Sequence, residues 1–271
     1  MEARGSKRIR LVAADVDGTL VDSAKRVPAG FAEAVRRLRE HGIRFVIASG
    51  RQYWNVLETF GPAADDAIIL PENGSMLIDG GEATYASRIP DAAIEAVLDA
   101  VRDIPTAYPM LSGVKATYVR RCSAFCASEM AKYYARRVVG EDAFAQAKDD
   151  TICKIAIFDD ESSARNVWPA VRHFAERYHP VLSADNWLDV MNQGVDKGSG
   201  LRVIMDRLGV EPEECMAFGD YGNDIGMLRI CGDSYAMANA TDDVKSICRH
   251  IAPSNDDDGV MRVLRREFPF L

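Results

Sequence analysis

The sequence predicts an α/β protein, in which a parallel-sheet core is made of two separated segments and a second, α+β unit is inserted between them. Three observations support this fold class. Apolar strand patterns and helical patterns alternate from residue 9 to residue 74, the alternation breaks in the middle of the chain, and it returns after residue 190. Strands that alternate with helices are typical of a parallel sheet.

The first strand is expected within Ile9–Leu20, which reads IRLVAADVDGTL. Its apolar run ends abruptly in Asp15 and Asp17, and Gly18 permits a sharp turn straight afterwards. Side chains at i and i+2 of an extended strand point the same way, so the two carboxylates are expected to face one spot. Two such charges resist joint ionisation unless a cation lies between them, and Mg²⁺ prefers oxygen ligands. The alternative is a strand followed by a solvated Asp-Gly turn.

Polar residues also follow the next two expected strands. A helix with Pro28 in its first turn ends at Gly42, and the strand Ile43–Ala48 then ends in Ser49-Gly50-Arg51. After another helix, the strand Ala67–Leu70 ends in Pro71-Glu72-Asn73-Gly74. These polar clusters would lie at the carboxyl edge of the sheet, where open α/β sheets bind ligands.

The pattern changes in the middle of the chain. A hairpin is expected at 75–86, followed by helices near 90–101, 128–139 and 161–177 and by strands at 115–121, 151–158, 180–184 and 187–191. We therefore predict a discontinuous core of residues 1–82 and 190–271, with a separate domain at 83–189.

The α/β pattern returns near the end of the chain. Asp196-Lys197-Gly198 precedes a helix that runs to about Leu208, and the short strand Glu214–Phe218 ends in a polar cluster that reads GDYGND. A further strand is expected near Tyr235–Met237, and the tail at 258–268 reads as an amphipathic helix.

Composition limits the class of protein. The chain has 271 residues, is 48% hydrophobic and carries a net charge of −8, so a sizeable core is expected and a general nucleic-acid binder is not. No apolar stretch approaches the roughly 20 residues of a membrane span, and the first apolar run is too short for a signal peptide. Six scattered cysteines without a CxxC pair indicate free thiols in a reducing cytoplasm. The protein is expected to be a monomer or a homodimer.

Four short motifs, in order, resemble those of the haloacid dehalogenase superfamily: Asp15-Val16-Asp17-Gly18-Thr19-Leu20, Ser49-Gly50-Arg51, Lys197-Gly198 and Gly219-Asp220-x-x-Asn223-Asp224. The long insertion between the second and third motifs resembles the α/β cap of the Cof-type phosphatase branch. The resemblance covers nearly the whole chain and implies a Rossmann-like core with a cap domain.

The resemblance also implies a chemistry for each motif. Asp15 would be the nucleophile that forms an aspartyl-phosphate, and Asp17 would protonate the departing alkoxide and then activate water. Mg²⁺ would be held by Asp15, the backbone carbonyl of Asp17, and Asp220, with Asp224 as a further metal-site carboxylate.

The phosphate-binding residues implied by the resemblance are Ser49, Gly50, Lys197 and Asn223, which would contact the phosphoryl group and stabilise its charge in the transition state. Each has a plainer interpretation when it is taken alone. Ser49 could cap a helix, Lys197 could be a solvated lysine, and Asn223 could be a turn residue.

The predicted function is a Mg²⁺-dependent phosphomonoester hydrolase acting on a small phosphorylated metabolite, for example a sugar phosphate. Two alternatives stay open. A phosphotransferase or phosphomutase on the same scaffold would pass the phosphoryl group to another hydroxyl, and a phospho-acceptor or binding protein would not turn over. Against a receiver-type phospho-acceptor, Asp17 supplies an acid/base group and an inserted cap would have no use.

Overall fold

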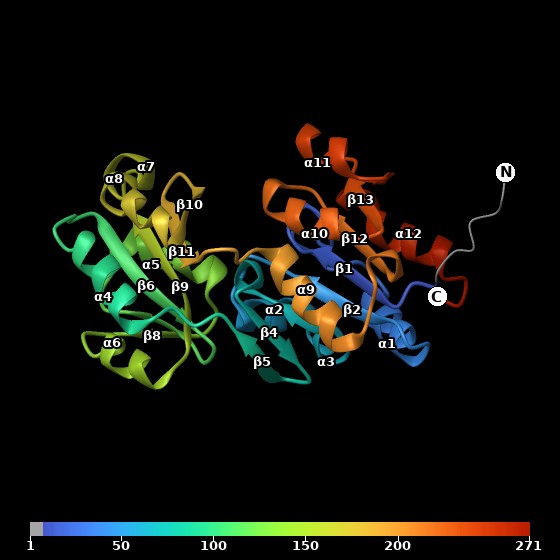
Figure 1. Cartoon of the computed structure of the whole chain (residues 1–271), viewed down its shortest axis with the longest axis horizontal. Helices are drawn as coiled ribbons and strands as arrows, with labels where there is room; N and C mark the ends of the chain where they lie inside the picture. The colour runs from blue at the N-terminus through green and yellow to red at the C-terminus, as the bar shows by residue number, and fades with distance from the viewer. Residues whose placement is uncertain (1–7) are drawn as a thin grey trace. The chain divides into compact units, whose positions relative to one another are not determined.

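The computed structural model describes residues 8–271, which form two compact units (Figure 1). The core unit runs from residue 8 to Gly50 and adds Val56–Glu82 and Asp196–Leu271. The inserted unit is made of Ala83–Val195 together with the short segment Arg51–Asn55. In Figure 1 the core unit therefore carries the blue and the orange-to-red parts of the chain, and the green and yellow parts lie in the inserted unit.

The core unit contains an eight-stranded sheet whose first six strands are parallel, and this confirms the predicted α/β fold class. A hairpin adds two more strands. The first is antiparallel to its neighbour, and of the second, β5 (Glu82–Ala86), only Glu82 belongs to the core unit. In sheet order the strands are β14 (His250–Ala252), β13 (Asp233–Met237), β12 (Cys215–Gly219), β1 (Leu11–Asp15), β2 (Arg44–Ala48), β3 (Ile68–Leu70), β4 (Met76–Asp79) and β5 (Glu82–Ala86).

Strand β1 is buried along its whole length because parallel strands pair on both sides and are covered on both faces. It pairs with β12 from Leu11 opposite Cys215, and with β2 as far as Asp15 opposite Ala48. The apolar run before Asp15 is thus the centre of the core. Two segments that are more than 200 positions apart in the sequence meet there.

The helices of the core unit follow the apolar spacing of the sequence. Helix α1 (Phe31–Glu40) buries Phe31, Val35 and Leu38, and the Phe31 ring meets Phe45 of β2 edge-to-face at 5.2 Å. The other helices are α2 (Tyr53–Phe60), α3 (Pro62–Asp66), α9 (Lys197–Leu208), α10 (Ile225–Ile230), α11 (Asp242–Ile247) and α12 (Gly259–Glu267). Short 3₁₀ turns are η1 (Glu72–Gly74), η4 (Pro212–Glu214), η5 (Gly222–Asp224) and η6 (Asn255–Asp257).

The inserted unit is an α+β unit built on a six-stranded sheet. In sheet order its strands are β10 (Tyr178–Ala184), β11 (Trp187–Asn192), β9 (Ile152–Asp159), β6 (Ala107–Gly113), β7 (Thr117–Val119) and β8 (Arg137–Val139). Its helices are α4 (Asp91–Ala100), α5 (Ala124–Tyr133), α6 (Ala143–Gln146), α7 (Ser163–Asn166) and α8 (Trp168–Val171), with the 3₁₀ turns η2 (Ala147–Asp149) and η3 (Arg172–Glu176).

The predicted inserted unit differs from the structure in three details. The helix expected at 161–177 is broken into α7, α8 and η3, and Pro169 lies at the start of α8, where it lacks the N–H that a continuous helix needs. The helix expected at 128–139 is α5, which ends at Tyr133, and the chain then enters β8. Strand β6 was not predicted, because Pro109 interrupts its apolar pattern.

Within residues 8–271, no helix combines the length and the apolar character that a bilayer span requires.

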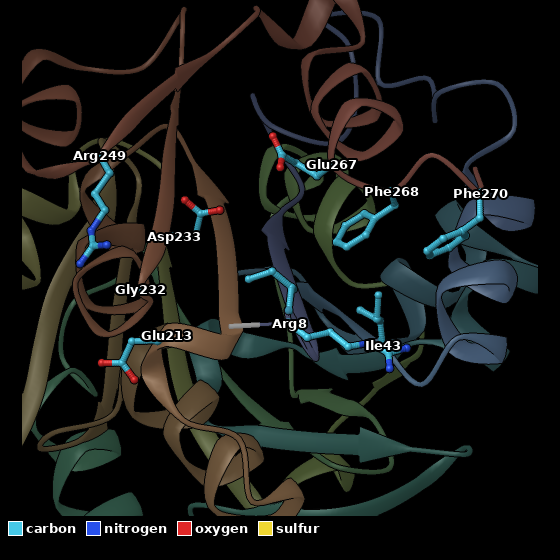
Figure 2. A pocket seen from close by; sticks show the side chains of 10 residues that line it. Arg8, Ile43, Glu213, Gly232, Asp233, Arg249, Glu267, Phe268 and Phe270 are labelled. Carbon is cyan, nitrogen blue, oxygen red and sulfur yellow. The ribbon is translucent and has the colours of Figure 1, made fainter. Parts of the chain in front are cut away.

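A cavity of about 410 Å³ lies at the amino ends of the core strands, opposite the edge where the predicted site residues follow their strands (Figure 2). Residues that precede β1, β2, β12, β13 and β14 line it, and Phe268 and Phe270 close one side. None of the predicted site residues lines this cavity. The predicted site residues lie instead at the carboxyl edge of the sheet, where Asp15 ends β1 and Ser49 and Asp220 follow β2 and β12.

Candidate active site

The candidate site lies where the parallel strands of the core unit end. Asp15 is the last residue of β1, and Asp220 directly follows the neighbouring strand β12. Ser49 directly follows β2 on the other side. Because parallel neighbours end at the same edge, polar residues that are distant in sequence become neighbours in space.

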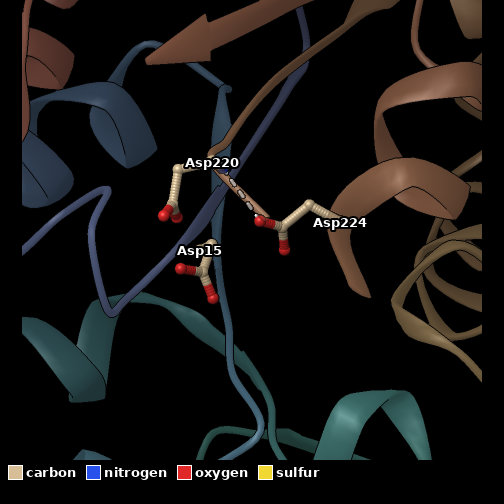
Figure 3. A group of neighbouring side chains, drawn as sticks. All are labelled: Asp15, Asp220 and Asp224. Carbon is tan, nitrogen blue, oxygen red and sulfur yellow. Dashed lines mark hydrogen bonds between the residues drawn. The ribbon is translucent and has the colours of Figure 1, made fainter. Parts of the chain in front are cut away.

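Three carboxylates form the centre of the site (Figure 3). Asp15, Asp220 and Asp224 each offer an oxygen, and these oxygens all lie within 4.8 Å of one another. Asp224 comes from the turn η5, and Figure 3 shows its carboxylate beside the backbone of Asp220. A set of three hard oxygen donors fits a hard divalent cation, so the cluster could hold a metal ion.

The cluster resists full ionisation. Burial raises the pKa of Asp15 well above its ordinary value, Lys197 works in the opposite direction, and Asp224 raises the pKa further. Burial also raises the pKa of Asp220. Three ionised carboxylates around one ammonium leave negative charge uncompensated, and a divalent cation would supply the missing balance.

Lys197 is fully buried and is the first residue of α9. Its Nζ donates to Asp15 Oδ1 and, at 2.6 Å, to Asp224 Oδ1. Burial lowers the pKa of Lys197, but the attraction of the two carboxylates outweighs burial, and the pKa is raised. Lys197 is therefore a fixed positive charge. A capping box between Asp196 and Ser199 fixes the helix turn that carries it.

Hydrogen bonds fix the orientation of the other two carboxylates. Thr19 Oγ1 donates to Asp220 Oδ1 at 2.9 Å, and Asp224 Oδ2 accepts from the backbone N–H groups of Asp220 and Tyr221 at 3.0 and 3.2 Å. Gly18 has a φ of 82°, and a Cβ at this position would lie 2.8 Å from the Asp220 carboxyl carbon. Only glycine lets the first loop approach Asp220 so closely.

Asp17 is placed differently from Asp15. Strand β1 ends at Asp15, so the alternation of an extended strand does not reach Asp17. The Asp17 carboxylate accepts from Lys25 Nζ at 2.7 Å and does not belong to the three-carboxylate cluster. The two acids of the first motif thus have different surroundings: one is buried beside Lys197, and the other is partly exposed beside Lys25.

The remaining predicted residues follow β2 and β12. Ser49 is buried, and its backbone N–H donates to the Leu70 carbonyl at 2.9 Å. Gly50 lies against the side chain of Asn73, which is 3.1 Å from a Cβ built at Gly50. Asn223 Nδ2 donates to Asn73 Oδ1 at 3.1 Å. Gly50 and Asn223 are therefore brought to the same asparagine.

The structure adds three residues to which the sequence analysis gave no role: Thr19, Asn73 and Asn239. Asn239 follows β13, and its Nδ2 donates to the Gly18 carbonyl at 2.8 Å. Asn73 lies in the polar cluster that the sequence analysis placed at the carboxyl edge of the sheet, although no role was assigned to it there. Asn239 follows β13, so its position after a strand could also have indicated it. Thr19 gave no separate signal, because threonine is common in turns.

A family model described as haloacid dehalogenase-like hydrolase matches residues 12–264. The chain belongs to this family. A solved structure of a haloacid dehalogenase-like hydrolase from Bacteroides thetaiotaomicron superposes with a TM-score of 0.84 at 25% identity, over 96% of this chain and 100% of the other. The chain is thus a hydrolase with the core and cap architecture of that family.

Two curated bacterial relatives cover nearly the same length. The 5-amino-6-(5-phospho-D-ribitylamino)uracil phosphatase YbjI of Escherichia coli is 28% identical over 97% of this chain and 98% of its own. The HMP-PP phosphatase of Klebsiella pneumoniae is 27% identical over 91% of this chain and 90% of its own. Relatives at nearly equal identity therefore carry the names of different phosphorylated substrates.

Replacement of Lys197 by methionine is expected to destabilise the protein by about 3–5 kcal/mol near neutral pH, because Asp15 and Asp224 lose a buried counter-charge. An acid whose pKa is raised in the folded state destabilises that state at every pH above its ordinary pKa. The loss of stability caused by Lys197→Met should therefore grow as the pH rises from about 5 to about 8. Urea unfolding of both proteins at these two pH values measures it, and a pH-independent loss would contradict the charge argument.

Proposed function

We propose that the chain is a Mg²⁺-dependent phosphomonoesterase that acts on a small phosphorylated metabolite through an aspartyl-phosphate intermediate. One observation carries the proposal: a buried carboxylate at the end of the central strand touches a buried lysine and faces two further carboxylates. This set provides a nucleophile, a fixed positive charge and donors for a hard cation in one place. Hydrolysis of a phosphate ester through an aspartyl-phosphate would use all three.

Asp15 is the proposed nucleophile. One of its oxygens attacks phosphorus in line with the ester oxygen, and the P–O bond to the substrate alcohol breaks as the aspartyl-phosphate bond forms. The attack requires the ionised carboxylate, which Lys197 favours although burial opposes it. A bound Mg²⁺ would complete the charge balance and neutralise the phosphoryl oxygens, with Asp15, the Asp17 carbonyl, Asp220 and Asp224 as the residues that hold it.

Asp17 is the proposed general acid and base. Its carboxyl group gives a proton to the departing alkoxide in the first step. In the second step it takes a proton from water as the water oxygen attacks phosphorus, the bond between phosphorus and the Asp15 oxygen breaks, and inorganic phosphate leaves the regenerated carboxylate. The different surroundings of the two acids suit this division of labour. Asp15 is held against the buried ammonium group of Lys197, whereas Asp17 is partly exposed and contacts the exposed side chain of Lys25.

The phosphoryl group would be held from several directions. Lys197 pairs with it and damps the charge on Asp15, the Ser49 hydroxyl and the Gly50 amide donate to its oxygens, and the Asn223 amide donates from the loop after β12. Donors that are already in place stabilise the charge of the transition state without reorganisation.

The substrate class is a small phosphorylated metabolite, in keeping with the compounds that name the two curated relatives. A phosphorylated ribitylamino-pyrimidine and HMP-PP differ in the group that carries the phosphate. We therefore propose the chemistry of the phosphoryl group and assign no leaving group.

The first test is the release of inorganic phosphate from a panel of sugar, nucleotide and small-acid phosphates, with and without Mg²⁺. Release should depend on Mg²⁺ and should fall by at least about 10³-fold in Asp15→Asn, because the amide is not a nucleophile. Asp65→Asn in the exposed part of α3 is the matched control and should keep full activity.

Two outcomes would contradict this proposal. Wild-type rates in Asp15→Asn would remove the nucleophile assignment. Transfer of the phosphoryl group to an added acceptor alcohol, with little free phosphate, would favour the phosphotransferase alternative.

The role of Asp17 predicts a dependence on the leaving group. Asp17→Asn should slow the hydrolysis of an alkyl phosphate by about 10²–10⁴-fold, because the departing alkoxide needs a proton. The formation of the aspartyl-phosphate from p-nitrophenyl phosphate, measured as a burst of p-nitrophenol, should change much less, since this leaving group needs none. Equal losses with the two substrates would show that Asp17 does not act as the acid.

The metal site predicts a pH-dependent stabilisation. Protons and Mg²⁺ compete for Asp15 and Asp220, whose pKa values are raised by burial. The increase in Tm on adding Mg²⁺ should therefore be larger near pH 8 than near pH 5. At a free Mg²⁺ concentration of about 100 times Kd, the free energy of unfolding rises by about 2.7 kcal/mol. Thermal unfolding measures it. Asp220→Asn should lose most of the increase, and an equal increase at both pH values would speak against binding at this cluster.

A further inference from the structure

The turn η1 follows β3 and lies outside the four motifs, yet it has an unusual backbone. Glu72, Asn73 and Gly74 have φ values of 51°, 54° and 90°, so three successive residues lie in the left-handed region. Residues other than glycine rarely adopt this conformation, and such segments gather at functional sites.

The turn contacts three segments that carry proposed phosphate ligands. The Asn73 backbone N–H donates to the Ser49 carbonyl at 2.9 Å. Gly74 lies against the residue before Lys197, because a Cβ on Gly74 would be 2.8 Å from the Asp196 carbonyl carbon. The Asn73 side chain accepts from Asn223. The loop after β2, the start of α9 and the loop after β12 thus meet at one short turn.

The Asn73 carboxamide fits between two of these segments. Its Oδ1 accepts from Asn223 Nδ2 at 3.1 Å, across 150 positions of the sequence. Its Oδ1 and Nδ2 lie 3.1 and 3.3 Å from a Cβ built at Gly50, so a side chain at position 50 would displace it. With Oδ1 engaged by Asn223, the amide group of Asn73 is held in one orientation beside Gly50.

We infer that Asn73 is a positioning residue. It fixes the side-chain amide of Asn223 and the backbone at Gly50, so that both of these groups can bind the phosphoryl group. This inference rests on the proposed function. A requirement of the backbone alone would favour glycine at position 73, because glycine adopts a positive φ without strain. Asparagine tolerates this conformation as well and adds the acceptor that Asn223 contacts.

The test is Asn73→Gly, which keeps the left-handed turn and removes the carboxamide. Its kcat/KM for the best phosphate ester should fall about tenfold, as expected for the loss of an oriented hydrogen bond to a charged group. KM and the inhibition constant of inorganic phosphate should rise, while stability to urea should stay the same or increase. Asp258→Gly is the matched control, since Asp258 also has a positive φ of 55° and lies before α12. It should change neither KM nor kcat.

A double-mutant cycle separates positioning from a structural role. If Asn73 acts through Asn223, then Asn73→Gly should cause little further loss of kcat/KM in an Asn223→Ala background. Full additivity of the two losses, or an unchanged KM in Asn73→Gly, would overturn the inference. A wild-type protein that releases no phosphate from any substrate would instead refute the proposed function, so the two failures are distinguishable.

Discussion

The ammonium group of Lys197 between Asp15 and Asp224 is the interaction on which the rest of the site depends. A buried charge is tolerated only when opposite charge and hydrogen bonds surround it. Here one lysine at the start of α9 serves carboxylates from β1 and from the turn η5. Three parts of the chain are thereby fixed to one point, and the residual negative charge of the cluster would favour a cation there.

The sheet explains how such distant residues come together. Six parallel strands end at one edge, and the loops that leave them are held by contacts that allow little variation: Gly18 against Asp220, Asn239 on the Gly18 carbonyl and Asn73 on Asn223. Each contact joins two loops rather than stabilising one. The electrostatic preorganisation that phosphoryl transfer requires is thus supplied by backbone geometry as much as by the charged groups themselves.

The sequence was sufficient to predict the fold class, because apolar runs that alternate with helical patterns leave few other arrangements. It also indicated that Asp15 and Asp220 would follow strands at one edge. It was insufficient where local patterns compete with tertiary pairing. Strand β6 contains Pro109, the helix expected at 161–177 contains Pro169, and nothing in the sequence marks Arg51–Asn55 as part of the inserted unit. The role of Asn73 depends on a contact across 150 positions, which no local pattern contains.

The pairing of β1 with β12 has a consequence for biosynthesis. During synthesis, the strand that carries Asp15 can pair with β2 early, but its other edge stays unpaired until residues 215–219 leave the ribosome. An apolar strand with an open edge is a template for association with other chains. The inserted unit, made of more than one hundred residues in between, therefore lengthens the period during which the nascent chain is exposed to aggregation and to chaperones.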